Sequence, residues 1–422
     1  MTPSSITQSV RQPEFAGVSY SVGLLATNLA GWGGGRDLLR LIAAGLASTG
    51  ARVKLLVPHD TFATRLREKV GVCRRSLVKL ANLERPEFVS GPKTDYLQVV
   101  ETVRSSGCEF DVVEYPSSRA GLASTLEEHG VDVVLPCLHS LGGDFPCRWV
   151  GYVGDLQHKY LPQFFARTDM AHRDRQFRRM LRDARTLIVA SRQVKADLEQ
   201  HYETGACNIF VLPFSPIPQK EWFTTDVESV RGRYALTVPY FLISNQFWVH
   251  KDHATAFKAL SLIAGRDVQL VCTGATHDGR APEYFGMLQR LVADLGLTGR
   301  VRFLGHIPKS DQIAIMRGAV AVLQPTLFEG GSGGGSVYEA VGIDTPVIVS
   351  DIAVNREIAD EGVEFFPVGS AQHLAELMDA KLGAPKSRVD DDVLLERAAM
   401  RRERLAAALM RAIGATMLGR RG

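Results

Sequence analysis

Residues 325–351 read PTLFEGGSGGGSVYEAVGIDTPVIVSD, and this stretch decides how the chain folds. An apolar segment with the composition of a buried strand precedes it at 319–325, and a second such segment ends it. Five glycines lie between Glu329 and Glu339, and a helix is expected from about Ser336. Strand, glycine loop, helix and strand form a βαβ unit, which predicts a parallel sheet.

The same alternation of apolar strands and helix-favouring segments extends in both directions from this stretch. In the second half the expected strands are 240–246, 268–274, 301–305, 319–325 and 345–351. In the first half they are 18–26, 51–58, 110–115, 131–138, 149–154, 186–191 and 208–213. Three prolines then fall within six residues, at Pro213, Pro216 and Pro218, and forbid a continuing helix. We place the domain boundary there.

The predicted fold class is α/β, with two doubly wound Rossmann-like domains that face each other across a cleft. A length of 422 residues supports two domains. The basic, amphipathic C-terminal segment is expected to form a helix that packs across the domain junction. The expected parts are a disordered N-terminus over 1–16, a first domain over 17–214, a second domain over 215–398 and a C-terminal helix over 399–422.

The composition is that of a soluble globular protein, because 45% of the residues are apolar and 23% are charged. A net charge of +3 gives no general affinity for nucleic acid. The six cysteines form no Cys-x-x-Cys pair and the histidines show no zinc spacing, so we expect a reduced, cytoplasmic environment and no bound metal. No signal peptide or membrane-spanning window is recognisable. The residues indicate no oligomeric state.

A basic segment lies at 167–185, where seven arginines accompany three acids at helical spacing. Such a segment is either a solvated helix face or a dock for an anionic surface or acceptor. The second interpretation predicts peripheral contact with the inner face of a membrane through the helix Arg167–Arg185.

The glycine loop has the composition of an anion site. Its glycines let backbone N–H groups approach an anion, and the helix near Ser336 directs its positive end to the same place. Glycines alone are equally consistent with a flexible surface loop or a tight turn. Glu329 and Glu339 favour the anion site, because carboxylates beside a phosphate have to engage hydroxyl groups, which sugars and ribose supply. The glycines concerned are Gly330, Gly331, Gly333, Gly334 and Gly335.

A second group of candidates follows the first strand of the second domain, in the segment NQFWVHKDH. Lys251 stands at the carboxyl end of that strand, where an ammonium group neutralises a leaving diphosphate. Its alternative interpretation is an ordinary surface lysine. Asn245 and Gln246 precede it and are candidates for binding the same ligand. His250 and His253 are expected to be structural.

The first domain offers two further groups. The loop GWGGGR opens a helix and does not have the G-x-G-x-x-G spacing of a dinucleotide site, which argues against a dehydrogenase. We expect it to close on the ligand across the cleft. Three titratable residues follow expected strands, and each histidine also has an interpretation as a hydrogen-bonded loop residue. The closure-loop residues are Gly33, Gly34, Gly35 and Arg36, and the titratable candidates are Asp155, His158 and His139.

Taken together, these segments resemble the GT-B glycosyltransferases of family 4, a retaining group. The resemblance rests on the glycine segment above all, with NQFWVHKDH, VASRQVKADL, VRFLGHIP and DLQHKYLPQFF. It implies a nucleotide-sugar donor held mainly by the second domain and a glycan or lipid-linked acceptor held by the first. It further implies that Glu329 holds donor-sugar hydroxyls, that Glu339 holds the ribose, and that Lys251 binds the diphosphate.

Two departures from the family pattern are visible. The two glutamates stand ten residues apart, where the family usually has eight, so the loop is longer. The family commonly has an arginine five residues before the lysine, where this chain has Gln246, so Arg36 or another arginine is expected to compensate. The resemblance implies no cofactor and no metal, and a leaving phosphate that takes the acceptor proton. The alternatives are a GT-B epimerase or phosphorylase, or a non-catalytic protein that binds nucleotide-sugars or glycans.

Overall fold

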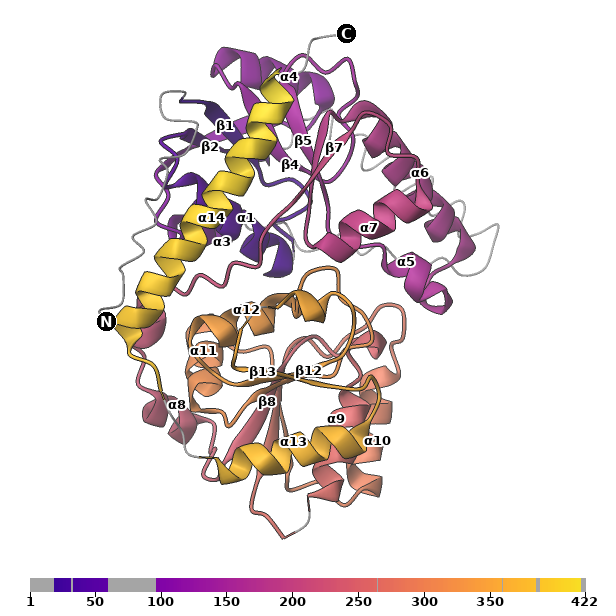
Figure 1. Cartoon of the computed structure of the whole chain (residues 1–422), viewed down its shortest axis with the longest axis vertical. Coiled ribbons are helices and arrows are strands. Elements are labelled where there is room, and N and C mark those ends of the chain that lie inside the picture. Colours follow the sequence, from indigo (N-terminus) through magenta and orange to yellow (C-terminus); the bar gives the residue numbers. More distant parts are fainter. Residues whose placement is uncertain are drawn as a thin grey trace, which may run out of the picture.

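The computed structural model describes residues 19–31, 33–59, 96–263, 265–358, 360–384 and 388–418. The expected disordered segment 1–16 lies outside these ranges. The chain forms two domains, each a sheet covered by helices, and the first domain lies above the second in Figure 1. The predicted α/β class with two Rossmann-like domains is therefore confirmed.

The first sheet has seven strands in the order β3-β2-β1-β4-β5-β6-β7. All pairings are parallel, as expected for buried apolar strands joined by helices. Its strands are β1 (Ser21–Leu25), β2 (Arg52–His59), β3 (Phe110–Pro116), β4 (Val133–Cys137), β5 (Arg148–Val153), β6 (Thr186–Val189) and β7 (Asn208–Val211). Its helices are α1 (Gly33–Leu46), α3 (Tyr96–Arg104), α4 (Arg119–Glu128), α5 (Gln157–Tyr160), α6 (Arg167–Asp183) and α7 (Arg192–His201).

The second sheet has six parallel strands in the order β10-β9-β8-β11-β12-β13. The strand β13 was not expected from the sequence. The strands are β8 (Tyr240–Ser244), β9 (Gln269–Thr273), β10 (Val301–Gly305), β11 (Val322–Gln324), β12 (Val347–Ser350) and β13 (Val363–Phe366). The helices are α8 (Val227–Arg233), α9 (His253–Leu262), α10 (Tyr284–Asp294), α11 (Lys309–Gly318), α12 (Gly334–Gly342) and α13 (Ala371–Gly383). Short 3₁₀ turns include η2 (Lys220–Phe223), η3 (Val249–Lys251) and η4 (Asn355–Glu357).

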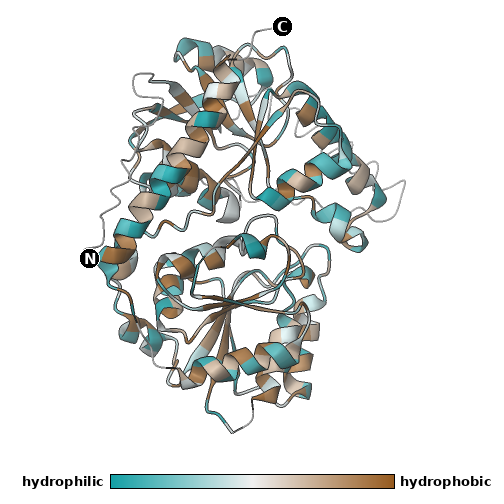
Figure 2. Cartoon of the chain, viewed as in Figure 1, coloured by the Kyte–Doolittle hydropathy of each residue, from teal (hydrophilic) through white to brown (hydrophobic). Residues whose placement is uncertain are grey.

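Each sheet has its own hydrophobic core. In the first domain, Leu39, Ile42, Ala43 and Leu46 of α1 have the spacing of one helix face and are buried against the strands. In the second domain, Phe241, Phe257 and similar side chains fill the space between the sheet and its helices. Figure 2 shows the strands of both domains in apolar colours, with polar residues on the outer helices.

The last helix, α14 (Asp391–Leu418), returns to the first domain. It packs on α1, β5, β6 and β7 and lies along the first domain in Figure 1. Leu405, Leu409 and Ile413 on its inner face belong to the core of that domain. The helix begins at Asp391, before the segment 399–422 expected from the sequence.

Candidate active site

The central strands of the second sheet bring two predicted residues together. β8 and β11 are neighbours, and both end at the same edge of the sheet. Lys251 follows β8 in η3, and Glu329 follows β11. Lys251 Nζ lies 2.5 Å from Glu329 Oε1, and the two side chains are only 8% and 10% exposed. The structure therefore holds a buried ion pair at the predicted site.

Gln324, at the last position of β11, organises this pair and was not among the predicted site residues. Its Nε2 donates to Glu329 Oε1 at 2.8 Å. Its Oε1 accepts from Asn245 Nδ2 and from Ser336 Oγ, the latter at 3.4 Å. Gln324 is fully buried. In the sequence, this position can be recognised as a polar amide residue at the end of an apolar run, directly before the glycine segment.

The glycine loop bends sharply into α12, which begins at Gly334. Gly333 has a φ of 70°, and a Cβ there would lie 2.4 Å from Val337 Cβ, so only glycine fits. No side chain caps the start of α12. Its first backbone N–H groups thus have the arrangement that binds anions at helix N-termini.

Glu339 lies on α12 and forms an ion pair with a different lysine, Lys309. Its carboxylate accepts from Lys309 Nζ and, at 3.1 Å, from Gln312 Nε2, which also donates to Ser244 Oγ at 2.7 Å. Burial raises the pKa of Glu339, while the charge of Lys309 opposes this change. The two glutamates of the loop are therefore neutralised separately. Neither Lys309 nor Gln312 was predicted.

The glycine loop of the first domain faces this site. Gly33, Gly34 and Gly35 form the first turn of α1. Asp37, in the next turn, has Oδ2 about 4.0 Å from where a Cβ on Gly335 would lie. The starts of α1 and α12 therefore approach each other across the domain seam. Arg36, expected to compensate for Gln246, donates to Ala30 O at 2.9 Å within its own loop.

The end of β5 contacts the glycine loop of the second domain. A Cβ on Gly330 would lie 2.0 Å from Gly154 O and 2.7 Å from Asp155 Cβ, so the approach requires glycine. Ser191 Oγ also donates to Gly330 O at 2.8 Å. Asp155, with a side chain 42% exposed, is thus the first-domain candidate that lies against the loop.

The two first-domain histidines lie within networks of their own domain. His158 Nε2 is 2.9 Å from Asp174 Oδ1, which also accepts from Tyr202 OH at 2.6 Å. The His158 side chain is 1% exposed, and burial lowers its pKa. His139 Nδ1 is 3.0 Å from Gln176 Nε2, and burial lowers its pKa as well.

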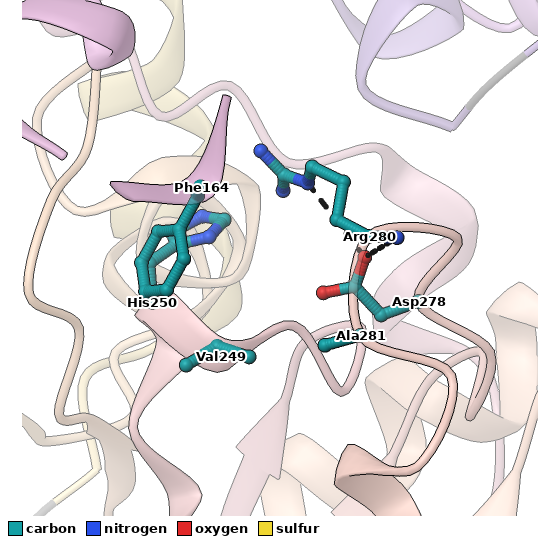
Figure 3. Close-up of a pocket in the computed structure, with 6 residues that line it drawn as sticks. All are labelled: Phe164, Val249, His250, Asp278, Arg280 and Ala281. Carbon is teal, nitrogen blue, oxygen red and sulfur yellow. Dashed lines mark hydrogen bonds and ion pairs between the residues drawn. The ribbon is translucent and has the colours of Figure 1, made fainter. Parts of the chain in front are cut away.

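A small cavity of about 50 Å³ lies at the seam next to Lys251. Figure 3 shows Phe164 of the first domain next to His250 of the second, with Arg280 on the other side of the cavity. Arg280 Nη1 donates to Gln157 Oε1 at 3.1 Å, and its guanidinium lies 5.4 Å from the Phe165 ring centre. Burial, with the nearby charge of Lys251, lowers the pKa of His250 to about 3. His250 is therefore neutral at physiological pH.

Within the described residues, no group of three or more His, Cys, Asp or Glu side chains has the arrangement of a metal site. Across the same ranges, no helix has the length and apolar character needed to cross a membrane.

Comparison with known proteins gives a partial sequence match. Residues 228–390, in the second domain, match the family model described as "Glycosyl transferases group 1". The O-antigen chain mannosyltransferase RfbU of Salmonella typhimurium is 31% identical over 123 residues, which are 29% of this chain and 33% of that protein. A D-inositol 3-phosphate glycosyltransferase of Corynebacterium aurimucosum is 28% identical over 181 residues, 40% of this chain and 41% of its own. The matched segments thus span between a third and about two fifths of the length of these relatives.

The structural match extends over nearly the whole chain. The structure of Anabaena Alr3699/HepE in complex with UDP and glucose has a TM-score of 0.62 and is 14% identical. The match covers 94% of this chain and 99% of that one. The chain therefore has the GT-B fold, and its second domain matches glycosyl transferases group 1.

Proposed function

We propose that this chain is a glycosyltransferase that moves a sugar from a nucleotide-sugar donor to a hydroxyl group of a glycan or lipid-linked glycan. The observation that carries the proposal is the buried Lys251–Glu329 pair beside the start of α12. A cation and the N–H groups at a helix N-terminus suit a diphosphate, and a carboxylate suits sugar hydroxyls. The match to glycosyl transferases group 1 and the UDP complex of the Anabaena neighbour support this assignment.

In this proposal each part of the site has a separate task. Lys251 and the N–H groups of α12 stabilise the negative charge that develops on the leaving diphosphate. Glu329 orients the donor sugar, and Gln324 fixes the carboxylate through its amide. Glu339 holds the ribose once the nucleotide replaces Lys309 as its partner. Asn245 supports Gln324 from the neighbouring strand.

We further propose transfer with retention of configuration, as in glycosyltransferase family 4. The leaving phosphate takes the acceptor proton, and Asp155 lines the first-domain side of the reacting centre. His158, held on Asp174, supports the fold around that centre. No metal is required for charge stabilisation in this scheme, so transfer is expected to persist in EDTA.

The acceptor is proposed to lie on the first domain and to be anionic or membrane-borne. Five arginines of α6 are exposed, and four of them have the spacing of one helix face: Arg175, Arg178, Arg179 and Arg182. Arg179 and Arg182 share Asp183 as a partner, so the row keeps a net positive charge. Such a row suits the anionic lipids of the cytoplasmic membrane face. We propose that the chain acts there in the synthesis of a cell-surface polysaccharide or glycoconjugate.

The test begins with a thermal-shift panel of UDP, GDP, dTDP and ADP, which selects the donor base. Sugar nucleotides of that base are then incubated with glycan and lipid-linked acceptors, and the product is followed by mass spectrometry. Glu329→Ala and Lys251→Ala should each lower transfer at least about 100-fold, whereas Lys195→Ala, a surface change on α7, should not. Parent-like transfer by both site variants contradicts the proposal. Interconversion of a sugar nucleotide without acceptor indicates an epimerase, and stabilisation without turnover indicates a binding protein.

A further inference from the structure

The short turn η4 contacts the glycine loop of its own domain. Asn355, its first residue, is fully buried. Its Oδ1 accepts from Gly333 N at 2.9 Å, and its Nδ2 donates to Ser350 O at 2.8 Å. Gly333 is the residue at which the glycine loop turns into α12. Asn355 therefore holds the Gly333 end of the glycine loop against the end of β12.

Two residues further on, the same turn contacts the other domain. The Glu357 carboxylate accepts from Arg192 N at 2.9 Å and from Gln193 N at 2.8 Å. These N–H groups belong to the first turn of α7, where the helix itself offers no acceptor. A carboxylate at this place also meets the positive end of the helix. A second-domain side chain thus caps a first-domain helix.

Ser191 completes a closed set of contacts. As the N-cap of α7, its Oγ accepts from Val194 N at 3.1 Å. The same hydroxyl donates to Gly330 O at 2.8 Å. The glycine loop is consequently held at Gly333 from its own domain and at Gly330 from the first domain. The start of α7 is common to the Glu357 and Ser191 contacts.

We propose that Glu357 is a positioning residue that couples closure of the two domains to the ordering of the glycine loop. When the domains separate, Glu357 leaves the start of α7, and Ser191 leaves Gly330 with it. The glycine loop then keeps the Asn355 contact at Gly333 and the partners of Glu329 in its own domain, but it loses the contact at Gly330. Closure by itself therefore orders the Gly330 end of the loop, which carries Glu329.

The consequence for catalysis rests on the proposed function. Asn355 keeps the start of α12 in place in either state, so binding of a nucleoside diphosphate depends little on Glu357. The backbone next to the sugar-facing Glu329 depends on closure through the Gly330 contact, although the Glu329 carboxylate stays paired with Lys251 and Gln324. A Glu357 variant should therefore lower kcat about tenfold or more and change the affinity for UDP by less than about threefold.

Amide hydrogen exchange on the ligand-free full chain tests the coupling without requiring any activity. Glu357→Ala should accelerate exchange at Arg192 and Gln193 about tenfold or more, because two charge-assisted hydrogen bonds are lost. It should also accelerate exchange in the loop 330–335, which Glu357 does not touch. Glu357→Gln, which keeps one acceptor oxygen, should give an intermediate effect at both places.

Arg356→Ala is the matched control, because Arg356 lies on the same turn and pairs with Asp351 within its own domain. It should leave both segments as in the parent, and strand β8 should stay protected in all variants. Accelerated exchange at the start of α7 with an unchanged loop overturns the coupling, and so does an unchanged α7. If the parent transfers no sugar, the proposed function fails while the exchange result still decides the coupling.

Discussion

Replacing the buried pair stepwise separates its structural role from its role in binding. Lys251→Met leaves the Glu329 carboxylate 10% exposed with Gln324 as its remaining partner. Removal of one partner of a buried pair costs about 3–5 kcal/mol of unfolding free energy. Glu329→Gln should cost a similar amount, because it leaves the Lys251 ammonium buried without its counter-charge. The double variant leaves no unpaired charge and should unfold within about 1–2 kcal/mol of the parent.

The assay is urea unfolding of the parent, both single variants and the double variant. The coupling free energy from this cycle should be about 3 kcal/mol or more. Lys195→Met, which removes the surface pair with Glu199 at 3.9 Å, is the control and should cost less than about 0.5 kcal/mol.

Titration calorimetry with UDP then reports the second role. Lys251→Met and the double variant should both lose at least about tenfold in affinity, because both lack the ammonium that is proposed to bind the diphosphate. Stability should therefore recover in the double variant while binding does not. Additive losses of stability, or UDP binding by Lys251→Met as tight as in the parent, would refute the reasoning.

Three further predictions concern other parts of the molecule. His253 is fully buried, and burial lowers its pKa from 6.5 to about 3, so its contribution is present above pH 6.5 and lost as the pH falls. Between pH 7 and pH 5 the parent should lose about 2 kcal/mol more unfolding free energy than His253→Phe, and equal losses in urea titrations would contradict this. Leu409→Ala should cost about 2–5 kcal/mol in the same measurement, whereas Met400→Ala, at a side chain 54% exposed, should cost little. Arg175→Glu with Arg178→Glu should weaken sedimentation with phosphatidylserine vesicles about tenfold or more, and unchanged sedimentation would remove the case for a membrane dock.

The sequence was sufficient to predict most of the fold, because parallel strands buried on both faces have an unmistakable composition. Every strand expected from an apolar run is present, with ends shifted by a few residues. The strand β13 was missed because it has four residues, includes Glu364 and lies at the edge of its sheet. Edge strands are only partly buried, so the apolar signal is weak there.

The site was only partly predictable. Lys251 and Glu329 are 78 residues apart, yet both follow central strands of one sheet, and the topology alone brings them together. Lys309 and Gln312 were not predicted, because α11 begins beside Glu339 only in the folded domain. His158 also follows a strand, but this position does not determine whether the side chain points into its domain. In the structure the side chain is buried.

Contacts between the domains were beyond reach of the sequence. Glu357 and Arg192 are 165 residues apart and belong to different domains. Their encounter depends on how two separately folded units are set against each other, which no local pattern encodes. The same holds for Ser191 and Gly330, 139 residues apart.

The return of α14 makes the second domain an insertion within the first. The chain passes from the first domain to the second after β7 and returns along the first part of α14, so two backbone segments connect the domains. A double connection restricts twisting and favours a hinge about one axis, which suits a closure that must bring Ser191 back to Gly330 each time. It also means that no single cut yields an intact first domain, since residues up to 214 would lack the helix that covers their apolar face. The first domain can therefore complete its core only when α14 packs on it.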